Sequence, residues 1–490
     1  MRRFLLVPVL ALALAATGCG SASKGGAGGG SIPAGASVVR AGVLAFVSID
    51  SDTGSGQWHQ LDKLAQKFPN RDKLVTQLKQ QLSKNGVDYD RDVKPALGPE
   101  VDVAVISGGT EETTNAVALT KPDDVAKFKA LVAKLNASES AGNRAVYRET
   151  DGWYVLSDDE DAITRALQGN GGLADDAAFK EAMDKLPGDA LAKAYVDGPG
   201  LNALVSRAAG SSASGLDSSS LGLGSLKWAS AALTAEDEGV RLKGTAKGGN
   251  LAGADFASAL MGGVPGDAFA LLDFSGKGTA DQLDKLRSNP QVATALEQLK
   301  AQLGVTADEL AGLLGGELAF YVRPGAVIPE FTLALKPQDE SAALATLDKL
   351  AARLASASGG HVTTDTQDGR LVKAVDLGNI SVRYGSAGDG KIVVTTGLNG
   401  IPDFAGSGSK LSDSADFKEA KDTAGMPDST GGITYVDIKN LLPVLEGFAN
   451  LAGGSVPQDT FDNLRPLRSL LAWSEGSGDT RSFDAFLEIK

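Results

Sequence analysis

The sequence predicts an α+β fold made of two tandem homologous repeats, each a mainly antiparallel sheet packed with helices. Three observations predict it. Motifs recur in the same order along the two halves of the chain, helical and strand patterns alternate within each half, and a hydrophobic content of 42% over 490 residues is enough to build ordinary cores.

The internal repeat covers nearly all of the chain after its first few dozen residues. Spacing between matched motifs varies along the chain, which indicates insertions in loops. The clearest matches are QLDKL at 60–64 and 282–286, LGPEVDVAV at 97–105 with LGGELAFYV at 314–322, FKEA at 179–182 and 417–420, and YVD at 195–197 and 435–437.

Each copy opens on a strand, continues through a Gly/Ser turn into helices, and then forms two strands joined by a polar turn. Neighbouring strands with short turns predict antiparallel pairing. A Lys-Pro step then opens a long helix, with proline in its first turn. A hairpin, short helices, the YVD strand, a further helix and a tryptophan-bearing hairpin follow, so we expect a sheet covered on one face. The strands expected first are 44–50, 101–106 and 116–119, with 268–274, 317–322 and 331–335 in the second copy.

These patterns divide the chain into five segments, each defined by its composition. The expected segments are a lipoprotein signal peptide at 1–18, a lipidated cysteine and Gly/Ser-rich tether at 19–39, repeat one at 40–247, a linker at 248–262 and repeat two at 263–490.

The N-terminus has the pattern of a secretory signal peptide. Arg2 and Arg3 precede an apolar run at 4–16, which is too short to span a membrane, since a span needs ~20 residues. The segment 16–19, Ala-Thr-Gly-Cys, resembles the lipobox of bacterial lipoproteins. The resemblance implies cleavage before Cys19, the only cysteine, and attachment of a diacylglyceryl group with acyl chains such as palmitate to its sulfur. An ordinary signal peptide followed by an incidental thiol is the alternative.

The pattern as a whole resembles a two-repeat bacterial lipoprotein family, common in high-GC Gram-positive bacteria and catalogued as domain of unknown function 3352. The resemblance rests on the lipobox, on FVSIDSDTGSGQWHQLDKL at 46–64 and on DGWYVLSDDEDA at 151–162. It implies a location outside the cytoplasm and transfers no catalytic residue.

Charge and cysteine content exclude several kinds of partner and of stabilisation. A formal net charge of -14 repels nucleic-acid phosphates and anionic lipid surfaces, so we expect no nucleic-acid partner. The membrane contact is therefore expected through the lipid on Cys19. With the single cysteine assigned to the lipid, the fold has no disulfide.

Three motifs look like ligand sites, but each fits a structural role better. GSAGDGK at 385–391 matches the P-loop spacing, yet Ile392 replaces the required Ser or Thr and strand-like segments flank it, which favours a hairpin turn. DSDTGSG at 50–56 lacks the glutamate of a calcium loop, which favours a turn before the next helix. SDDED at 157–161 could hold a metal, but Ser157 and Glu160 also form a capping box.

The two histidines, His59 and His361, occupy non-equivalent positions in the two copies. Neither has a nearby carboxylate or cysteine in the sequence, as a catalytic or zinc site usually does. We therefore expect no catalytic residue, no metal ligand and no cofactor.

Two functions fit these observations. The first is a membrane-anchored lipoprotein on the extracytoplasmic face of the cell membrane that is a non-enzymatic binding or interaction module of the cell envelope. The alternative is a carrier or chaperone for a lipid or other apolar ligand. A continuous apolar pocket of ligand size, roughly 300 to 1,000 Å³, inside or between the repeats would discriminate the two, and an aromatic content of 6% mildly favours the first.

Overall fold

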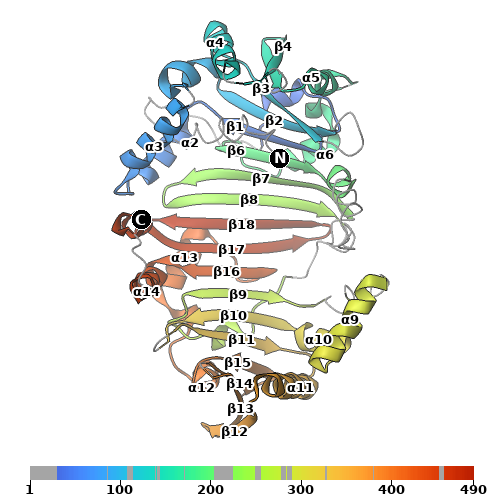
Figure 1. The fold of residues 1–490 in the computed structure, drawn as a ribbon, viewed down its shortest axis with the longest axis vertical. Helices are drawn as coiled ribbons and strands as arrows, with labels where there is room; N and C mark the ends of the chain where they lie inside the picture. Colours follow the sequence, from blue (N-terminus) through green and yellow to red (C-terminus); the bar gives the residue numbers. More distant parts are fainter. Residues whose placement is uncertain are drawn as a thin grey trace.

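The computed structural model describes residues 30–84, 86–107, 114–137, 139–140, 144–169, 171–203, 225–248, 255–277, 283, 290–325, 328–378, 380–451 and 457–490. All eighteen described strands form one continuous antiparallel sheet, with helices against it (Figure 1). The α+β prediction is therefore confirmed.

The strands of the first repeat are β1 (Ala45–Asp50), β2 (Glu100–Ser107), β3 (Thr114–Thr120), β4 (Val146–Thr150), β5 (Trp153–Ser157), β6 (Ala192–Asp197), β7 (Leu226–Glu236) and β8 (Gly239–Gly248). Those of the second are β9 (Ala270–Ser275), β10 (Glu317–Arg323), β11 (Glu330–Lys336), β12 (Val362–Gln367), β13 (Arg370–Asp376), β14 (Ser381–Gly388), β15 (Lys391–Thr395), β16 (Gly432–Asp437), β17 (Leu467–Ser477) and β18 (Thr480–Ile489).

The α-helices are α2 (Gly56–Ala65), α3 (Arg71–Lys84), α4 (Val125–Asn136), α5 (Glu160–Leu167), α6 (Ala177–Met183), α9 (Pro290–Leu303), α10 (Ala307–Leu314), α11 (Glu340–Ser358), α12 (Gly400–Ala405), α13 (Ala415–Ala424), α14 (Ile438–Leu451) and α15 (Gln458–Leu464). Short helical turns are η1 (Ala34–Ser37), η2 (Tyr89–Val93), η3 (Lys94–Ala96), η5 (Leu173–Asp175), η7 (Met261–Gly263) and η8 (Leu411–Asp413).

Strand order shows the duplication directly. Across the sheet it is β4-β5-β3-β2-β1-β6-β7-β8 in the first repeat and then β18-β17-β16-β9-β10-β11-β15-β14-β13-β12 in the second. The second half repeats the first in reverse, with the β12–β13 hairpin added. The two repeats therefore meet through their last strands, β8 and β18.

Helices pack against both faces of this sheet, whereas the sequence predicted one covered face. We call the face that carries Phe46 the entry face and the face that carries Ile49 the floor face. On the entry face, α5 and α6 cover the first repeat and α12 and α13 the second. On the floor face, α2 and α4 pack on the first repeat, and α10 and α11 on the second. Phe46 and Ile49 of β1 point to opposite faces, and both pack against helices. The alternation of apolar residues therefore did not show that both faces are covered.

The recurring FKEA and YVD motifs are explained by one aromatic contact on the entry face. Phe179 on α6 meets Tyr195 on β6 edge to face, with ring centroids 5.1 Å apart. Phe417 on α13 meets Tyr435 on β16 in the same way at 5.0 Å. Such pairs add about 1 kcal/mol beyond their burial.

The long helices α4 and α11 each begin after an aspartate cap and not at the preceding proline. Asp124 caps α4 and Asp339 caps α11, each accepting a bond from the backbone three residues on. The preceding prolines therefore lie before the caps and not in the first helical turn, so that prediction was wrong. At the cap position, an aspartate oxygen accepts a hydrogen bond from a free backbone N–H of the first helical turn. A proline side chain has no acceptor for that bond.

The seam between β8 and β18 has an internal two-fold symmetry. Gly239 opens β8 and Thr480 opens β18, each after a two-residue turn. Gly239 pairs with Glu488 at one end of the seam, and Thr480 pairs with Lys247 at the other. The two ends are therefore equivalent, because in each the first residue of one strand pairs with the ninth residue of the other.

Large side chains face small ones on either side of the seam axis. Leu242 lies opposite Ala485, and the equivalent pair is Phe483 opposite Gly244. A Cβ on Gly244 would stand 2.1 Å from the Phe483 ring, so glycine is required there. The strands can approach closely because each bulky side chain has a small partner.

On the entry face, Arg241 joins the two repeats through a part-buried ion pair. Its guanidinium donates to Asp484 Oδ1 at 2.7 Å and to the Ala424 carbonyl at 3.0 Å, both in the second repeat, and to Glu236 at 2.6 Å. It also lies 4.8 Å from the centre of the Phe486 ring. Burial raises the pKa of Asp484, and Arg241 opposes that rise.

We predict that Arg241→Ala lowers the free energy of unfolding by roughly 2 kcal/mol, because it removes the guanidinium that pairs with the part-buried Asp484 carboxylate. Thermal and urea unfolding measure the change. Lys243→Ala is the matched control: this exposed lysine on the same strand should cost less than about 1 kcal/mol. Equal stability of the two variants would contradict a structural role for the ion pair.

Candidate functional site

The floor face is apolar across its middle strands. Three neighbouring cross-strand registers run over eight strands, from β7 and β8 through β18, β17, β16, β9 and β10 to β11, and contain no charged residue. We call these residues the apolar floor. They are Leu233, Leu242, Ala485, Ala472, Thr434, Leu272, Phe320 and Leu333; Ala231, Gly244, Phe483, Ser474, Gly432, Phe274, Leu318 and Leu335; and Ala235, Val240, Leu487, Leu470, Val436, Ala270, Val322 and Phe331.

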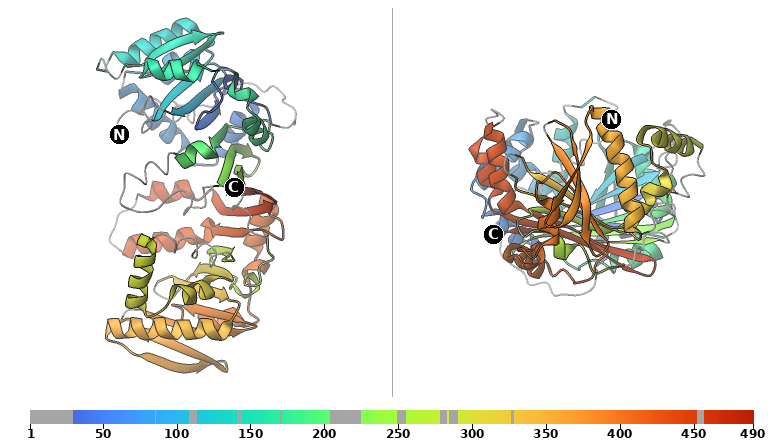
Figure 2. Two further views of the ribbon diagram at one scale, coloured as in Figure 1. Left: turned by 90° about the vertical axis from the view of Figure 1, so that its right-hand side faces the viewer. Right: turned by 90° about the horizontal axis from the view of Figure 1, so that it is seen from below.

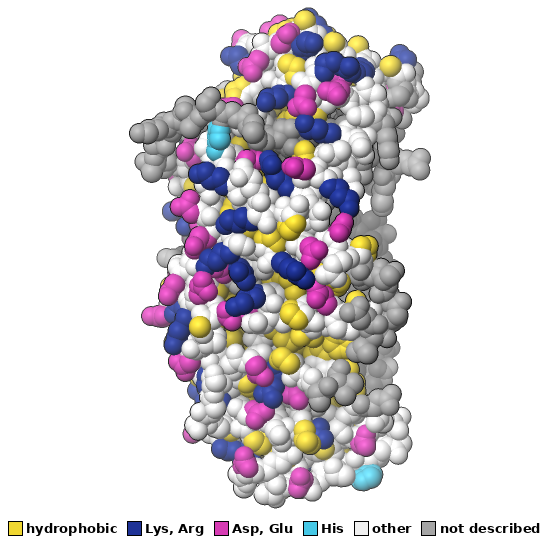
Figure 3. All heavy atoms as spheres, turned by 90° about the vertical axis from the view of Figure 1, so that its left-hand side faces the viewer, with side chains coloured by type: hydrophobic (Ala, Val, Ile, Leu, Met, Phe, Trp, Pro, Cys, Tyr) yellow, Lys and Arg dark blue, Asp and Glu magenta, His cyan; other side chains and the backbone are white. Residues whose placement is uncertain are grey.

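Seven large side chains of the apolar floor are between 36% and 44% exposed. Figure 3 views the molecule from the left-hand side of Figure 1 and shows apolar side chains gathered in the middle of that side. Soluble proteins rarely expose a contiguous apolar surface without a binding role. The seven are Leu233, Leu242, Leu272, Phe274, Phe320, Phe331 and Phe483.

A strip of small side chains runs along the middle of the floor. On one side of it stand Leu242 and Phe483, and on the other Leu272 and Phe274. Between them, β17 and β16 present only small residues in these two registers, and β18 adds Ala485 in one of them, so the side chains are shortest in this part of the floor. These residues are Ala485, Ala472, Thr434, Ser474 and Gly432.

Helices surround the apolar floor. Figure 1 looks onto it, with α14 beside one end of the strands and α9 beside the other, and with α2 to α4 above and α11 below. Figure 2 shows α9, α11 and α14 projecting from the same side of the sheet. These helices form a rim around the floor that is about one helix, ~10 Å, thick.

The floor offers hydrophobic contact and almost no polar recognition. Every strand in it except β7 and β11 at its ends is paired with other floor strands on both sides, so the backbone N–H and C=O groups are used in the sheet. Thr434 and Ser474 supply its only hydroxyls. Burial of its side chains would stabilise a complex by roughly 25 cal/mol per Å² of apolar area.

The entry face holds a buried polar register in the first repeat. Lys193 on β6, Ser48 on β1 and Asp102 on β2 lie side by side in consecutive strands, and all three are buried. Burial, and then the neighbouring Glu100 carboxylate, raise the pKa of Asp102 well above its usual range. Burial lowers the pKa of Lys193.

The same register in the second repeat also holds a buried carboxyl group. Asp273 on β9 pairs with Ala319 on β10, the positions that Ser48 and Asp102 occupy in the first repeat. Neither oxygen of Asp273 accepts a hydrogen bond of normal geometry. Burial raises its pKa to about 7.

These carboxyl groups lie where the chain enters each repeat. Glu100 accepts a bond from Gly35 N at 2.8 Å, and the equivalent Glu317 accepts bonds from Ala259 N and Leu260 N. A Cβ on Gly35 would stand 1.8 Å from Asp102 Oδ2, so this glycine lies directly over the carboxyl group. The entering segment closes the register from solvent.

A serine beside a lysine and an aspartate suggests hydrolytic chemistry, but the geometry does not support it. The Lys193 ammonium donates to the backbone carbonyls of Ser31 at 2.9 Å and Gly188 at 2.8 Å, which binds the entering segment. A nucleophile needs a base within hydrogen-bond reach and space for a substrate. These buried residues therefore hold the chain in place.

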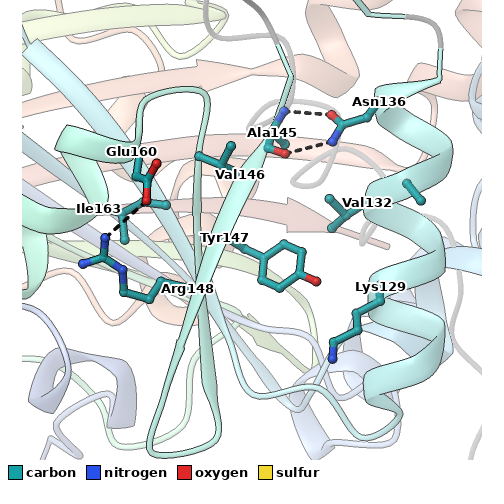
Figure 4. A pocket seen from close by; sticks show the side chains of 10 residues that line it. Lys129, Val132, Asn136, Ala145, Val146, Tyr147, Arg148, Glu160 and Ile163 are labelled. Atoms are coloured by element: carbon teal, nitrogen blue, oxygen red, sulfur yellow. Dashed lines mark hydrogen bonds and ion pairs between the residues drawn. The ribbon is translucent and has the colours of Figure 1, made fainter. Parts of the chain in front are cut away.

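Shallow cavities occur elsewhere, and their linings are mixed. One of about 480 Å³ lies between α4, β4 and α5 in the first repeat (Figure 4). Asn136 bridges it through two 2.8 Å bonds to the Ala145 backbone, and Arg148 lies 3.6 Å from Glu160. Others of about 440 and 420 Å³ lie beside α13 and beside Lys490. None joins the apolar floor.

Two of the three ligand-like motifs have the structural roles that we favoured. Residues 385–391 run from the end of β14 through the hairpin turn at 389–390 to the start of β15. In the turn before α2, the Asp50 carboxylate accepts bonds from Asp52 N and the Ser55 hydroxyl, and Ser55 caps the helix. Acids do start α5, but its cap is Asp159 and not the predicted Ser157, whose hydroxyl bonds to Ala116 O.

Cys19 lies outside the described residues, so its lipidation stays a prediction.

The two histidines lie apart from each other in the fold. His59 lies on α2, where its Nδ1 is 2.8 Å from Ser55 O, and His361 is exposed. Within the described ranges, no group of three or more His, Cys, Asp or Glu side chains could hold a metal ion. In the same ranges, no helix has the length and apolarity to cross a membrane.

The model of the family described as Protein of unknown function (DUF3352) matches residues 5–152 and 138–489. The chain belongs to this family. This DUF3352 member is also similar to two solved structures, crystal forms IV and III of TP0453, at 10% and 11% identity with a TM-score of 0.24 each. They cover 47% of this chain and 92% and 94% of theirs, and the likeness is too weak to bear on function. No curated protein matches.

We predict that Asp273→Asn stabilises the DUF3352 member as the pH rises. The raised pKa means that the folded state keeps a proton that the unfolded state releases near pH 4, so the wild type loses stability between pH 4 and about 7. Asparagine stays neutral. The stability gained over wild type should grow across that window to as much as roughly 4 kcal/mol.

Thermal unfolding at several pH values measures this difference, with Asp158→Asn, at an exposed position, as the control. A difference between Asp273→Asn and wild type that does not change with pH would show that the buried carboxyl group is not protonated in the folded state.

Proposed function

We propose that the protein is a membrane-anchored lipoprotein on the extracytoplasmic face of the cell membrane and a non-enzymatic binding module of the cell envelope. The apolar floor is its binding surface. The observation behind this proposal is the run of three uncharged registers across eight strands, with seven large side chains more than a third exposed. Such a surface is costly in water unless a partner covers it.

The path of the chain supports the anchoring part of the proposal. Residues from Gly30 onward pack against the entry face, where Lys193 holds Ser31 and Glu100 holds Gly35. The floor faces the opposite way, so a tether attached to the entry face leaves it accessible. The Gly/Ser-rich composition of the sequence after Cys19 is typical of a linker, and a coil of about 12 such residues has a reach of roughly 20 Å.

The non-enzymatic part of the proposal rests on the chemistry of the floor side chains. Proton transfer and nucleophilic attack need titratable or nucleophilic groups at the bound substrate. The floor presents hydrocarbon side chains and two hydroxyls, and the carboxyl groups of Asp102 and Asp273 lie on the other face of the sheet. This arrangement suits binding.

We predict that the sulfur of Cys19 carries the anchor. In cells grown with an alkyne analogue of palmitate, the wild-type protein should be labelled and should enter the detergent phase on partition. Cys19→Ala should lose the label, because no other thiol is present. A wild-type protein without label, or a labelled Cys19→Ala variant, would contradict the anchoring proposal.

We predict that the floor contacts a partner in the cell. A photo-crosslinking amino acid, p-benzoylphenylalanine, at Phe320 should form adducts in intact cells, because this side chain lies on β10 in the floor and is 38% exposed. The matched control is the same amino acid at Leu371, which is 58% exposed on β13 and outside the floor. If neither position forms adducts, or both do so equally, the binding function is wrong.

A further inference from the structure

We infer that the apolar floor binds the hydrocarbon chains of a single membrane lipid, an inference that rests on the proposed binding function. The charge of the floor points to this class of ligand. The molecule has a net charge of -14, yet the floor has no charged side chain in any of its three registers. An uncharged surface is complementary to an uncharged ligand segment.

An extended peptide fits this surface poorly. It would bring one N–H and one C=O per residue, and strand addition needs a free sheet edge. In the middle of the floor β18, β17, β16 and β9 each have strand neighbours on both sides. Each unpaired backbone group buried there would cost about 1–3 kcal/mol. A hydrocarbon chain has no such groups and gains about 0.8 kcal/mol for each buried methylene.

A second copy of the chain also fits poorly. Packed sheets lie about 10 Å apart, whereas helices about 10 Å thick stand around the floor of each copy. Two copies placed face to face would therefore hold their floors roughly 20 Å apart. The ligand must be thin enough to lie inside the rim formed by α9, α11 and α14 (Figures 1 and 2).

The dimensions of the floor suit lipid chains. Eight strands at a spacing of about 4.8 Å make it ~34 Å long. A bilayer core is ~30 Å thick, so the chains of one leaflet extend ~15 Å. The strip of small side chains between Phe483 and Phe274 spans two registers, ~7 Å along the strands, and gives room for part of such a chain. At one end of the strip, Arg481 donates to the Ser474 hydroxyl at 3.1 Å, so the surface becomes polar where a head group would leave it.

The test extracts the full-length protein from its membrane and quantifies non-covalently bound lipid by mass spectrometry. Wild type should carry about one lipid per chain. The double variant Leu272→Lys/Phe320→Lys places two charges in the floor at positions 42% and 38% exposed, and should retain at least tenfold less. The control Leu371→Lys/Leu398→Lys changes two residues that are 58% and 61% exposed outside the floor and should match wild type. Circular dichroism checks that all three proteins are folded.

A second arm uses vesicles of phosphatidylcholine that contain a pyrene-labelled phosphatidylcholine. Wild type and control should remove the labelled lipid from the vesicles and lower excimer fluorescence, and the floor variant should not. Equal lipid content in floor and control variants, or no lipid with any of them, would overturn the inference.

Failure here is distinct from failure of the proposed function. If the crosslinker at Phe320 joins the chain only to a protein, or if light scattering shows a dimer that Leu272→Lys/Phe320→Lys dissociates, the lipid inference is wrong while the floor remains a binding surface. If the position forms no adducts at all, both are wrong.

Discussion

The pairing of β8 with β18 is the interaction on which the rest of this structure depends. Each repeat ends in a strand that has a neighbour on one side only within its own repeat. An exposed strand edge of nine or so residues would invite aggregation. Here β8 and β18 cover each other's free edge. One contact therefore both joins the two repeats and protects their strand edges.

The seam also creates the binding surface. The floor takes β7 and β8 from the first repeat and β18, β17, β16, β9, β10 and β11 from the second, so neither repeat contains it alone. The symmetric facing of Leu242 with Ala485, and of Phe483 with Gly244, keeps it continuous where the repeats join. The two faces of the sheet thus differ: the entry face holds the incoming chain through buried polar groups, and the apolar floor on the other face is uncharged and partly exposed.

Part of this fold could be predicted from the sequence. Repeated motifs gave the duplication, and turn residues gave the hairpins, because both are local signals. The strand order could not be predicted, because the β8–β18 pairing joins residues far apart in sequence. Nor could the floor: ELAFYVR in β10 is apolar on both faces, which is typical of a strand buried on both sides, yet Phe320 is exposed.

Asp102 and Asp273 were missed because neither belongs to a recognisable motif, although a lone aspartate within an apolar strand is itself a signal.

Hydrogen–deuterium exchange at the seam tests the central claim most directly. If the two repeats share one sheet, the amides of β8 and β18 should exchange as slowly as those of β7 and β17, because all are held in the same ladder. Amides of β8 and β18 that exchange several orders of magnitude faster than those neighbours would mean that the repeats are independent, and would contradict both the single sheet and the continuous floor.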